Sequence, residues 1–282
     1  MTTKDLRGQE TAKAMGAALA PRINALKSRR IIPTLAIVRV GEKPDDVYYQ
    51  RSATRRCEAL GISVEVYAFS EGIAEEQLVN EIMNLNMDEH IHGILILRPL
   101  PGHIDDAVVC KALNPGKDVD GVTDRSLAGV MKNERRGFSP CTARACIEIL
   151  DYFGIEIAGR HTVVIGRSLV VGKPLSLMLT ARDATVTVCH TKTRDLTAIA
   201  KQADILVAAA GRSRMINREY VKEDAVVIDV GINADENGNL TGDVDYEDVR
   251  GIASAITPVP GGVGIVTTAV LASQVVEAAE QS

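Results

Sequence analysis

A glycine-rich turn between a predicted strand and a predicted helix is the first group of residues that points to chemistry. Strand His161–Ile165 ends at Gly166, and a helix is predicted from Gly172 with Pro174 in its first turn. Proline suits that position because its missing N–H has no helical partner there. Glycines let the backbone approach a pyrophosphate, whose charge the helix N-terminus favours. Because the spacing is not G-x-G-x-x-G, the segment is either a dinucleotide site or a plain strand-to-helix turn.

The residues after the next predicted strand bear on which dinucleotide would bind. An NAD site usually has an Asp or Glu about 20 residues beyond the glycine turn, where it holds the ribose 2′-hydroxyl. The strand Ala184–Cys189 is instead followed by His190-Thr-Lys-Thr-Arg194, which contains no acid. Together with Arg167 these donors favour the 2′-phosphate of NADP, and the alternatives are NAD or a solvated basic loop.

The cysteines and histidines do not have the spacing of metal ligands. The chain has five cysteines without a C-x-x-C pair, which is typical of reduced thiols rather than a disulfide framework. None of the five histidines belongs to an H-E-x-x-H pattern. We therefore predict no metal.

Length, composition and charge indicate which class of protein positions these residues. At 282 residues and roughly 150 residues per domain, the chain is expected to form about two domains. A hydrophobic content of 46% and a charged content of 24% are typical of globular proteins. The net charge of -5 argues against nucleic acid as a partner. No apolar run approaches the ~20 residues of a membrane helix, and the polar start lacks a signal-peptide pattern. We expect a cytoplasmic protein with no membrane partner.

Strand-like runs alternate with helical patterns along the chain, which predicts an α/β protein with parallel sheets. The predicted strands are 32–40, 62–69, 92–97, 161–165, 184–189, 204–209 and 225–230. The predicted helices are 45–60, 75–87, 141–153, 172–182, 196–202 and 266–280.

A domain boundary is predicted between Asn114 and Pro140, where glycine, proline, asparagine and charged residues gather. The prediction is two α/β domains flanking a cleft. Residues 1–139, joined by a C-terminal helix over 265–282, form the first domain. Residues 140–264 form a Rossmann-like domain with a parallel sheet that binds the nucleotide.

Seven motifs, in order along nearly the whole chain, carry a resemblance to a known family. They are Arg98-Pro-Leu-Pro101, Lys117-Asp-Val-Asp-Gly121, Pro140-Cys-Thr142, Gly166-Arg-Ser-x-x-Val-Gly-x-Pro174, Asp229-Val-Gly-Ile-Asn233, Gly242-Asp-Val244 and Thr257-Pro-Val-Pro-Gly-Gly-Val-Gly264. With these motifs the chain resembles the methylenetetrahydrofolate dehydrogenase/methenyltetrahydrofolate cyclohydrolase family.

The resemblance implies a folate-binding catalytic domain, a C-terminal NADP-binding domain and a homodimer. It implies an oxidoreductase of one-carbon metabolism and purine biosynthesis that transfers hydride from 5,10-methylenetetrahydrofolate to NADP. In most members a cyclohydrolase step then gives 10-formyltetrahydrofolate. By resemblance, Tyr49 stacks on the folate and Asp120 binds the pterin, which makes these two the candidate catalytic residues. Further substrate contacts would be Leu97, Pro99, Leu100, Gly261 and Gly262, and nucleotide contacts would be Gly166, Arg167, Ser168, Gly172, Thr191 and Ile232.

Two family positions needed for the hydrolytic step carry residues that cannot move a proton. The family has a lysine one helical turn after the tyrosine, with a glutamine beside it. The alignment puts Ala53 at the lysine position and Leu97 at the glutamine position. Residues four apart share a helix face, so Tyr49 and Ala53 should both face the cleft. Lys43 precedes the helix and is not expected to reach inward. We therefore expect a dehydrogenase whose cyclohydrolase activity is lost or nearly lost.

Three other interpretations remain open at this point. One is a bifunctional enzyme in which another group supports hydrolysis. Another is a shikimate-type dehydrogenase, although a convincing Lys and Asp pair for hydroxyl oxidation is missing. The third is a folate- or nucleotide-binding module without catalysis, because a fold alone does not determine function.

Overall fold

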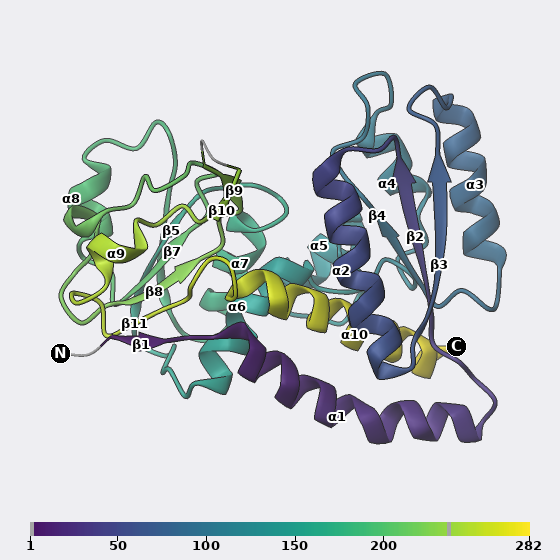
Figure 1. Ribbon diagram of the computed structural model, residues 1–282, viewed down its shortest axis with the longest axis horizontal. Helices are drawn as coiled ribbons and strands as arrows, with labels where there is room; N and C mark the ends of the chain where they lie inside the picture. The colour runs from purple at the N-terminus through teal and green to yellow at the C-terminus, as the bar shows by residue number, and fades with distance from the viewer. Residues whose placement is uncertain (1–2, 236–237) are drawn as a thin grey trace. The chain divides into compact units, whose positions relative to one another are not determined.

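The computed structural model describes residues 3–235 and 238–282, and these form two compact units. Unit 1 consists of Met1–Lys13 and Thr142–Thr267. Unit 2 consists of Ala14–Cys141 and Thr268–Ser282. Each unit is a layered α/β structure around its own parallel sheet (Figure 1). The α/β prediction is therefore confirmed.

Unit 1 contains a six-stranded sheet in which every pairing is parallel. The strand order is β1-β11-β8-β7-β5-β6. Its strands are β1 (Lys4–Asp5), β11 (Ala255–Ile256), β8 (Val226–Asp229), β7 (Ile205–Ala208), β5 (His161–Ile165) and β6 (Thr185–Cys189). Central strands of such sheets are covered on both faces and read as apolar runs. All four residues of β7 are accordingly buried.

The helices of unit 1 lie between these strands in the chain, as a Rossmann-like domain requires. They are α6 (Cys141–Tyr152, whose first residue falls in unit 2), α7 (Gly172–Thr180), α8 (Leu196–Ala200), the 3-10 turn η1 (Arg218–Tyr220) and α9 (Tyr246–Val249). A short antiparallel pair, β9 (Asn233–Ala234) and β10 (Leu240–Thr241), stands apart from the sheet. The prediction of a Rossmann-like parallel-sheet domain is confirmed.

Unit 2 is built on a three-stranded parallel sheet in the order β3-β2-β4. The strands are β2 (Thr34–Val40), β3 (Ser63–Phe69) and β4 (Gly93–Ile96). All seven residues of the central strand β2 are buried. Its helices are α2 (Pro44–Leu60), α3 (Glu75–Met87), α4 (Asp106–Ala112), α5 (Asp124–Lys132) and most of α1 (Gly8–Ser28) and α10 (Val263–Gln281).

The division into units differs from the predicted one at the N-terminus. Residues 1–139 were expected to form one domain, yet Met1–Lys13 belongs with the later sheet. The reason is backbone pairing, since Lys4 N donates to Ser254 O at 2.9 Å and Leu6 N to Ile256 O at 2.8 Å. Strands of two residues carry almost no periodic signal, so neither β1 nor β11 was predicted.

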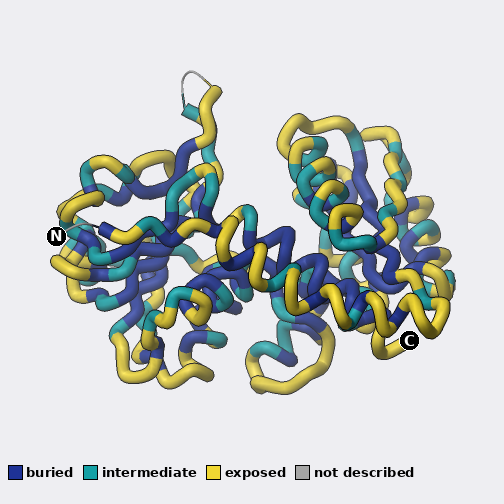
Figure 2. The backbone as a smooth tube through the Cα atoms, turned by 60° about the horizontal axis from the view of Figure 1, so that its bottom comes forward, coloured by how far each residue is buried: buried dark blue, intermediate teal, exposed yellow. Residues whose placement is uncertain are grey.

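The C-terminal helix α10 is the most apolar long helix in the described part of the chain. By length and composition alone it would be able to cross a membrane. However, 78% of its apolar window is buried inside the protein, as is usual for a core helix. Figure 2 shows buried residues along the strands and along this helix, with exposed residues on loops and outer helix faces.

Leu6 tests whether the N-terminal segment stabilises unit 1. Its side chain is fully buried, so Leu6→Ala should lower the free energy of unfolding of unit 1 by about 2–5 kcal/mol. The control Arg7→Ala removes a side chain that is 66% exposed and should cost at most ~1 kcal/mol. Denaturant unfolding followed by hydrogen exchange measures the stability of each unit separately. An equal loss of unit 1 stability in both variants would contradict the assignment of the N-terminal segment to unit 1.

Candidate active site

The first group of candidate residues lies in unit 2, where the parallel strands end. Leu97 follows β4 directly, and its N–H donates to Val38 O on the neighbouring strand at 2.9 Å. Ligands of α/β proteins bind at the carboxyl ends of such strands. Leu97 and Leu100 are nevertheless buried, with 5% and 8% of their surface exposed, whereas Pro99 is exposed. The two leucines therefore pack into the core of unit 2 beneath this loop.

Helix α2 brings Tyr49, Ala53 and Cys57 into line at intervals of four residues. The helix begins at Pro44 and ends at Leu60, and it is capped by Gly61, whose positive φ of 81° favours glycine. Ala53 and Cys57 are fully buried, and Tyr49 is partly buried at the start of the same row. A lysine at position 53 would therefore have to extend its amine out of a buried position.

Asp120 and Tyr49 are electrostatic neighbours in unit 2. Burial raises the pKa of Asp120 to about 7, and the nearby Asp118 acts in the same direction. Burial also raises the pKa of Tyr49 well above its usual value, with the charges of Asp120 and Cys141 adding to it. The carboxylate thus titrates near neutral pH beside a phenol that stays protonated.

Two basic side chains belong to the loop after β4 or contact it. The charge of Arg98 opposes the effect of burial and lowers the pKa of Asp120. The Lys43 ammonium donates a hydrogen bond to Pro99 O at 2.9 Å. Lys43 is itself exposed, so this hydrogen bond places its side chain on the outside of the loop after β4, and the expectation that it does not reach inward stays a prediction.

The second group of candidate residues lies in unit 1, at the turn between β5 and α7. Gly166 has a φ of 131°, and a Cβ there would lie 2.2 Å from Ala209 O. At Gly172 a Cβ would lie 2.2 Å from Gly166 O and 2.8 Å from Arg167 N. Only glycine fits either position, so the strand-to-helix turn is tightly closed on itself.

The side chains around this turn are open to solvent. Arg167, Ser168 and Thr191 are all exposed. Ser168 Oγ accepts a hydrogen bond from Val171 N at 3.1 Å, which shapes the turn ahead of α7. Helix α7 offers its N-terminus beside exposed guanidinium and hydroxyl groups, so this edge of unit 1 suits an anion.

Two buried aspartates hold the loops on which Ile232 is presented. Asp243 accepts hydrogen bonds from Ala210 N at 2.6 Å, Gly211 N at 2.9 Å and Arg212 N at 2.8 Å. Asp229 accepts from Gly231 N at 2.9 Å, Asp243 N at 3.0 Å and Val244 N at 3.0 Å. Burial raises the pKa of Asp229 to about 7, against the effect of these backbone hydrogen bonds. Ile232 itself is 67% exposed at the surface of unit 1.

The turn containing Gly261 and Gly262 also belongs to unit 1. Gly261 has a φ of 112°, and its carbonyl accepts a hydrogen bond from Gly8 N at 2.9 Å. A Cβ on Gly262 would lie 2.6 Å from Pro258 O. The start of α1 therefore packs directly on this turn, which explains why Gly8 has no room for a side chain either.

Sequence reasoning did not single out Asp229 and Asp243 as residues with a structural role in the site. Their motifs were used only for resemblance, although Asp229 ends the apolar strand β8. A carboxylate at the end of a buried strand is typical of a group that accepts backbone N–H groups, and this signal would have found Asp229. Asp243 follows Leu240-Thr-Gly242 and has no such local signal. No group of three or more His, Cys, Asp or Glu side chains that would hold a metal occurs within residues 3–235 and 238–282.

Arg98 offers a direct test of the electrostatics around Asp120. Replacing it in Arg98→Met removes the charge and keeps an unbranched stem, so the pKa of Asp120 should rise above about 7. Carboxyl carbon NMR over a pH series measures the midpoint of the Asp120 titration. Arg125→Met, which removes an exposed arginine of the same unit, should leave it unchanged. An unchanged midpoint in Arg98→Met would show that the guanidinium does not act on Asp120.

Two protein-family models match the chain. The model described as "Tetrahydrofolate dehydrogenase/cyclohydrolase, catalytic domain" matches residues 6–120. The model described as "Tetrahydrofolate dehydrogenase/cyclohydrolase, NAD(P)-binding domain" matches residues 140–282. Together the two matches cover both units of the structure.

Known proteins agree with this assignment along the full chain. The chain is 48% identical over 280 residues to a "Bifunctional protein FolD" of Clostridium botulinum, covering 99% of each sequence. A bifunctional methylenetetrahydrofolate dehydrogenase/cyclohydrolase structure from Campylobacter jejuni has a TM-score of 0.96 at 38% identity, covering 99% of each chain. A Trypanosoma brucei structure "complexed with NADP cofactor and inhibitor" has a TM-score of 0.94 at 33% identity, covering 100% of this chain and 98% of its own. The resemblance seen in the sequence is confirmed, and the chain belongs to the tetrahydrofolate dehydrogenase/cyclohydrolase family.

Proposed function

We propose that this protein is a 5,10-methylenetetrahydrofolate dehydrogenase that uses NADP and lacks the cyclohydrolase step. The observation that carries the proposal is the Tyr49–Asp120 pair, retained in a chain of this family beside a position 53 that bears only a methyl group. Substrate oxidation requires that a C–H electron pair leave as hydride while a substrate nitrogen stabilises the resulting cation. The protein has to orient the substrate and tolerate positive charge, and no proton carrier is needed.

Asp120 and Tyr49 would hold the folate in unit 2. The ionised carboxylate of Asp120 accepts hydrogen bonds from the N–H groups of the pterin, and its charge stabilises a nearby cation. Because the pKa of Asp120 is about 7, this ionised form predominates above that pH. Tyr49 keeps its proton because burial and the neighbouring Asp120 raise its pKa, and its ring is free to stack on the substrate.

The turn between β5 and α7 fits the pyrophosphate of a dinucleotide. Gly166 and Gly172 let the backbone of this turn close tightly ahead of the N-terminus of α7, and the neighbouring Arg167 is exposed. NADP, when bound, accepts the hydride from the substrate. Ser168 and Thr191 would contact the nucleotide with their hydroxyls, and Ile232 and the Gly261–Gly262 turn would border the nicotinamide and the substrate. Support for NADP over NAD comes from Arg167, from the acid-free segment 190–194 and from the NADP complex of the Trypanosoma brucei relative.

Hydrolysis of the methenyl product demands a group that moves a proton near neutral pH. Ala53 is fully buried and Leu97 is 5% exposed, and neither side chain can carry a proton. The competing proposal is a bifunctional enzyme, which the names of the relatives favour. In that case Lys43, whose ammonium donates to Pro99 O, is an amine held on the loop after β4 and the candidate for moving the proton.

Three further expectations accompany the proposed function. We propose that the protein acts in the cytoplasm, in one-carbon metabolism that supplies purine biosynthesis. We also propose a homodimer, as the resemblance implies. A cell that relies on this enzyme would need a separate cyclohydrolase to consume the methenyl product.

The two halves of the proposal are tested by one spectroscopic experiment. Purified protein is mixed with methylenetetrahydrofolate and NADP, then with NAD, and absorbance spectra are recorded over time. We expect reduced cofactor and methenyltetrahydrofolate to form together, faster with NADP. The methenyl product should then decay at the rate seen without enzyme.

Each contrary outcome identifies the statement that fails. If reduced cofactor rises while the methenyl product never builds up, a proton-carrying group exists and Lys43→Met should abolish the hydrolysis. If neither product forms although folate and nucleotide bind in calorimetry, the protein is a binding module.

Restoring both family residues should create hydrolytic activity. Ala53→Lys with Leu97→Gln supplies an amine and a neighbouring amide, and we expect decay of methenyltetrahydrofolate at least about tenfold above background. The matched control, Ala53→Met with Leu97→Gln, adds similar bulk without an amine. Equal decay rates in the two double variants, both folded by circular dichroism, would show that these positions do not explain the loss.

A further inference from the structure

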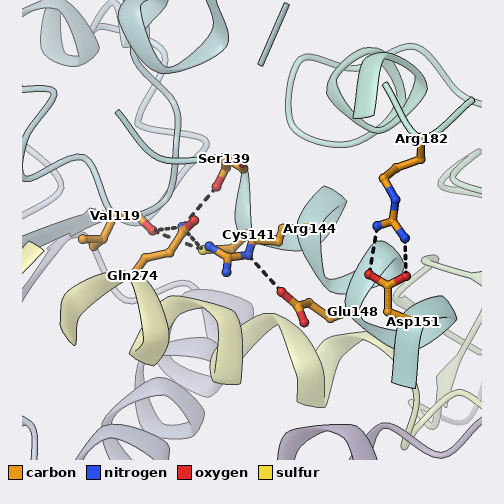
Figure 3. A network of polar contacts seen from close by, with 8 residues as sticks. All are labelled: Val119, Ser139, Cys141, Arg144, Glu148, Asp151, Arg182 and Gln274. Carbon is orange, nitrogen blue, oxygen red and sulfur yellow. Dashed lines mark hydrogen bonds and ion pairs between the residues drawn. The ribbon is translucent and has the colours of Figure 1, made fainter. Parts of the chain in front are cut away.

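Gln274 is a fully buried polar residue in the middle of the apolar helix α10. Burying an amide costs free energy unless its donors and acceptor are paired. In this chain the cost is offset by a specific set of partners in unit 2. Gln274 Nε2 donates to Val119 O at 2.7 Å and to Ser139 O at 3.1 Å, and it lies 3.3 Å from Cys141 Sγ (Figure 3).

The partners of Gln274 lie on the two segments next to Asp120, one that contains Val119 and one that contains Ser139 and Cys141. Val119 is the residue before Asp120, and Cys141 Sγ donates to Val119 O at 3.2 Å. The Cys141 thiol also interacts with the Asp120 carboxyl and lowers its pKa. One amide therefore contacts the backbone beside Asp120 and the thiol that interacts with its carboxyl.

The two segments joined by Gln274 are also in direct backbone contact. Gly121 has a φ of 68°, and a Cβ there would lie 2.5 Å from Pro140 N and from Ser139 C. Asp118 anchors the far end of the same loop by accepting hydrogen bonds from Val122 N at 2.9 Å and Thr123 N at 2.8 Å. Two contacts therefore hold the loop of residues 118–123. Asp118 binds the N–H groups at its far end, and Gln274 binds the Val119 carbonyl directly before Asp120.

We propose that Gln274 is a positioning residue for folate binding, which holds the Asp120 carboxyl in place through the Val119 carbonyl and the Cys141 thiol. It does not touch the substrate itself. This inference rests on the proposed function, in which Asp120 binds the pterin. It gives the C-terminal helix a role in substrate recognition, through a residue that lies outside all seven motifs.

Gln274→Met tests the proposal because methionine has similar length and no N–H group. We expect the KM for methylenetetrahydrofolate to rise about tenfold, with kcat changed less than about threefold and the KM for NADP unchanged. The matched control is Ser273→Ala, which removes the neighbouring buried hydroxyl of the same helix and should leave all three values as in the wild type.

A pH profile distinguishes positioning from general destabilisation. The titratable groups that interact with Asp120 are Arg98, Cys110, Asp118, Cys141 and Tyr49, and all are kept in Gln274→Met. A carboxyl that is no longer held will reach water, so the midpoint of kcat/KM against pH should fall below the wild-type value. A merely structural role would lower the amount of folded enzyme without moving this midpoint.

Calorimetry with tetrahydrofolate separates failure of this inference from failure of the proposed function. An active wild type whose Gln274→Met variant keeps its KM, midpoint and tetrahydrofolate affinity overturns the inference alone. A wild type that binds tetrahydrofolate without turnover overturns the proposed dehydrogenase, while a weaker affinity in the variant still supports the role of Gln274. If Gln274→Met does not fold, Gln274→Asn, which keeps the amide on a shorter stem, is measured in the same way with the same two outcomes.

Discussion

Buried carboxylates that accept backbone N–H groups hold the loops of both units. In unit 2, Asp118 binds the N–H groups of Val122 and Thr123. In unit 1, Asp243 and Asp229 do the same for the segments that follow β7 and β8. Loops at the ends of parallel strands have N–H groups without a strand partner, and each needs an acceptor when it is buried. A carboxylate satisfies two or three at once, so exposed side chains such as Ile232 stand on a rigid backbone.

Close backbone contact is the second constraint, and it explains where glycine occurs. Gly121 lies against the Ser139–Pro140 segment, Gly166 against Ala209, and Gly262 against Pro258. Two of these contacts join segments more than fifteen residues apart, so Gly121 and Gly166 each fit a partner supplied by another part of the chain. Tight contacts of this kind leave the turn backbones little freedom, which is what binding a pyrophosphate or a planar ring requires.

The regular elements were largely predictable because their sequence patterns are local. The strand predicted at His161–Ile165 has those bounds in the structure, and helix Glu75–Met87 also agrees. The pairing of β1 with β11 was not predictable, because two-residue strands have no period and join residues about 250 apart. The resemblance supplied the candidate site residues. It did not reveal Gln274 or the buried aspartates, whose roles depend on partners distant in sequence.

Neither unit is a continuous piece of the chain, and this has a consequence for biosynthesis. Unit 1 needs Met1–Lys13 together with Thr142–Thr267, and unit 2 needs its last segment, Thr268–Ser282. The changes of unit fall within helices α1, α6 and α10. A ribosome therefore releases the first strand of the large sheet long before its partner β11 exists. Domains generally fold as units as they emerge, but here folding of unit 2 is completed only when the final helix leaves the ribosome.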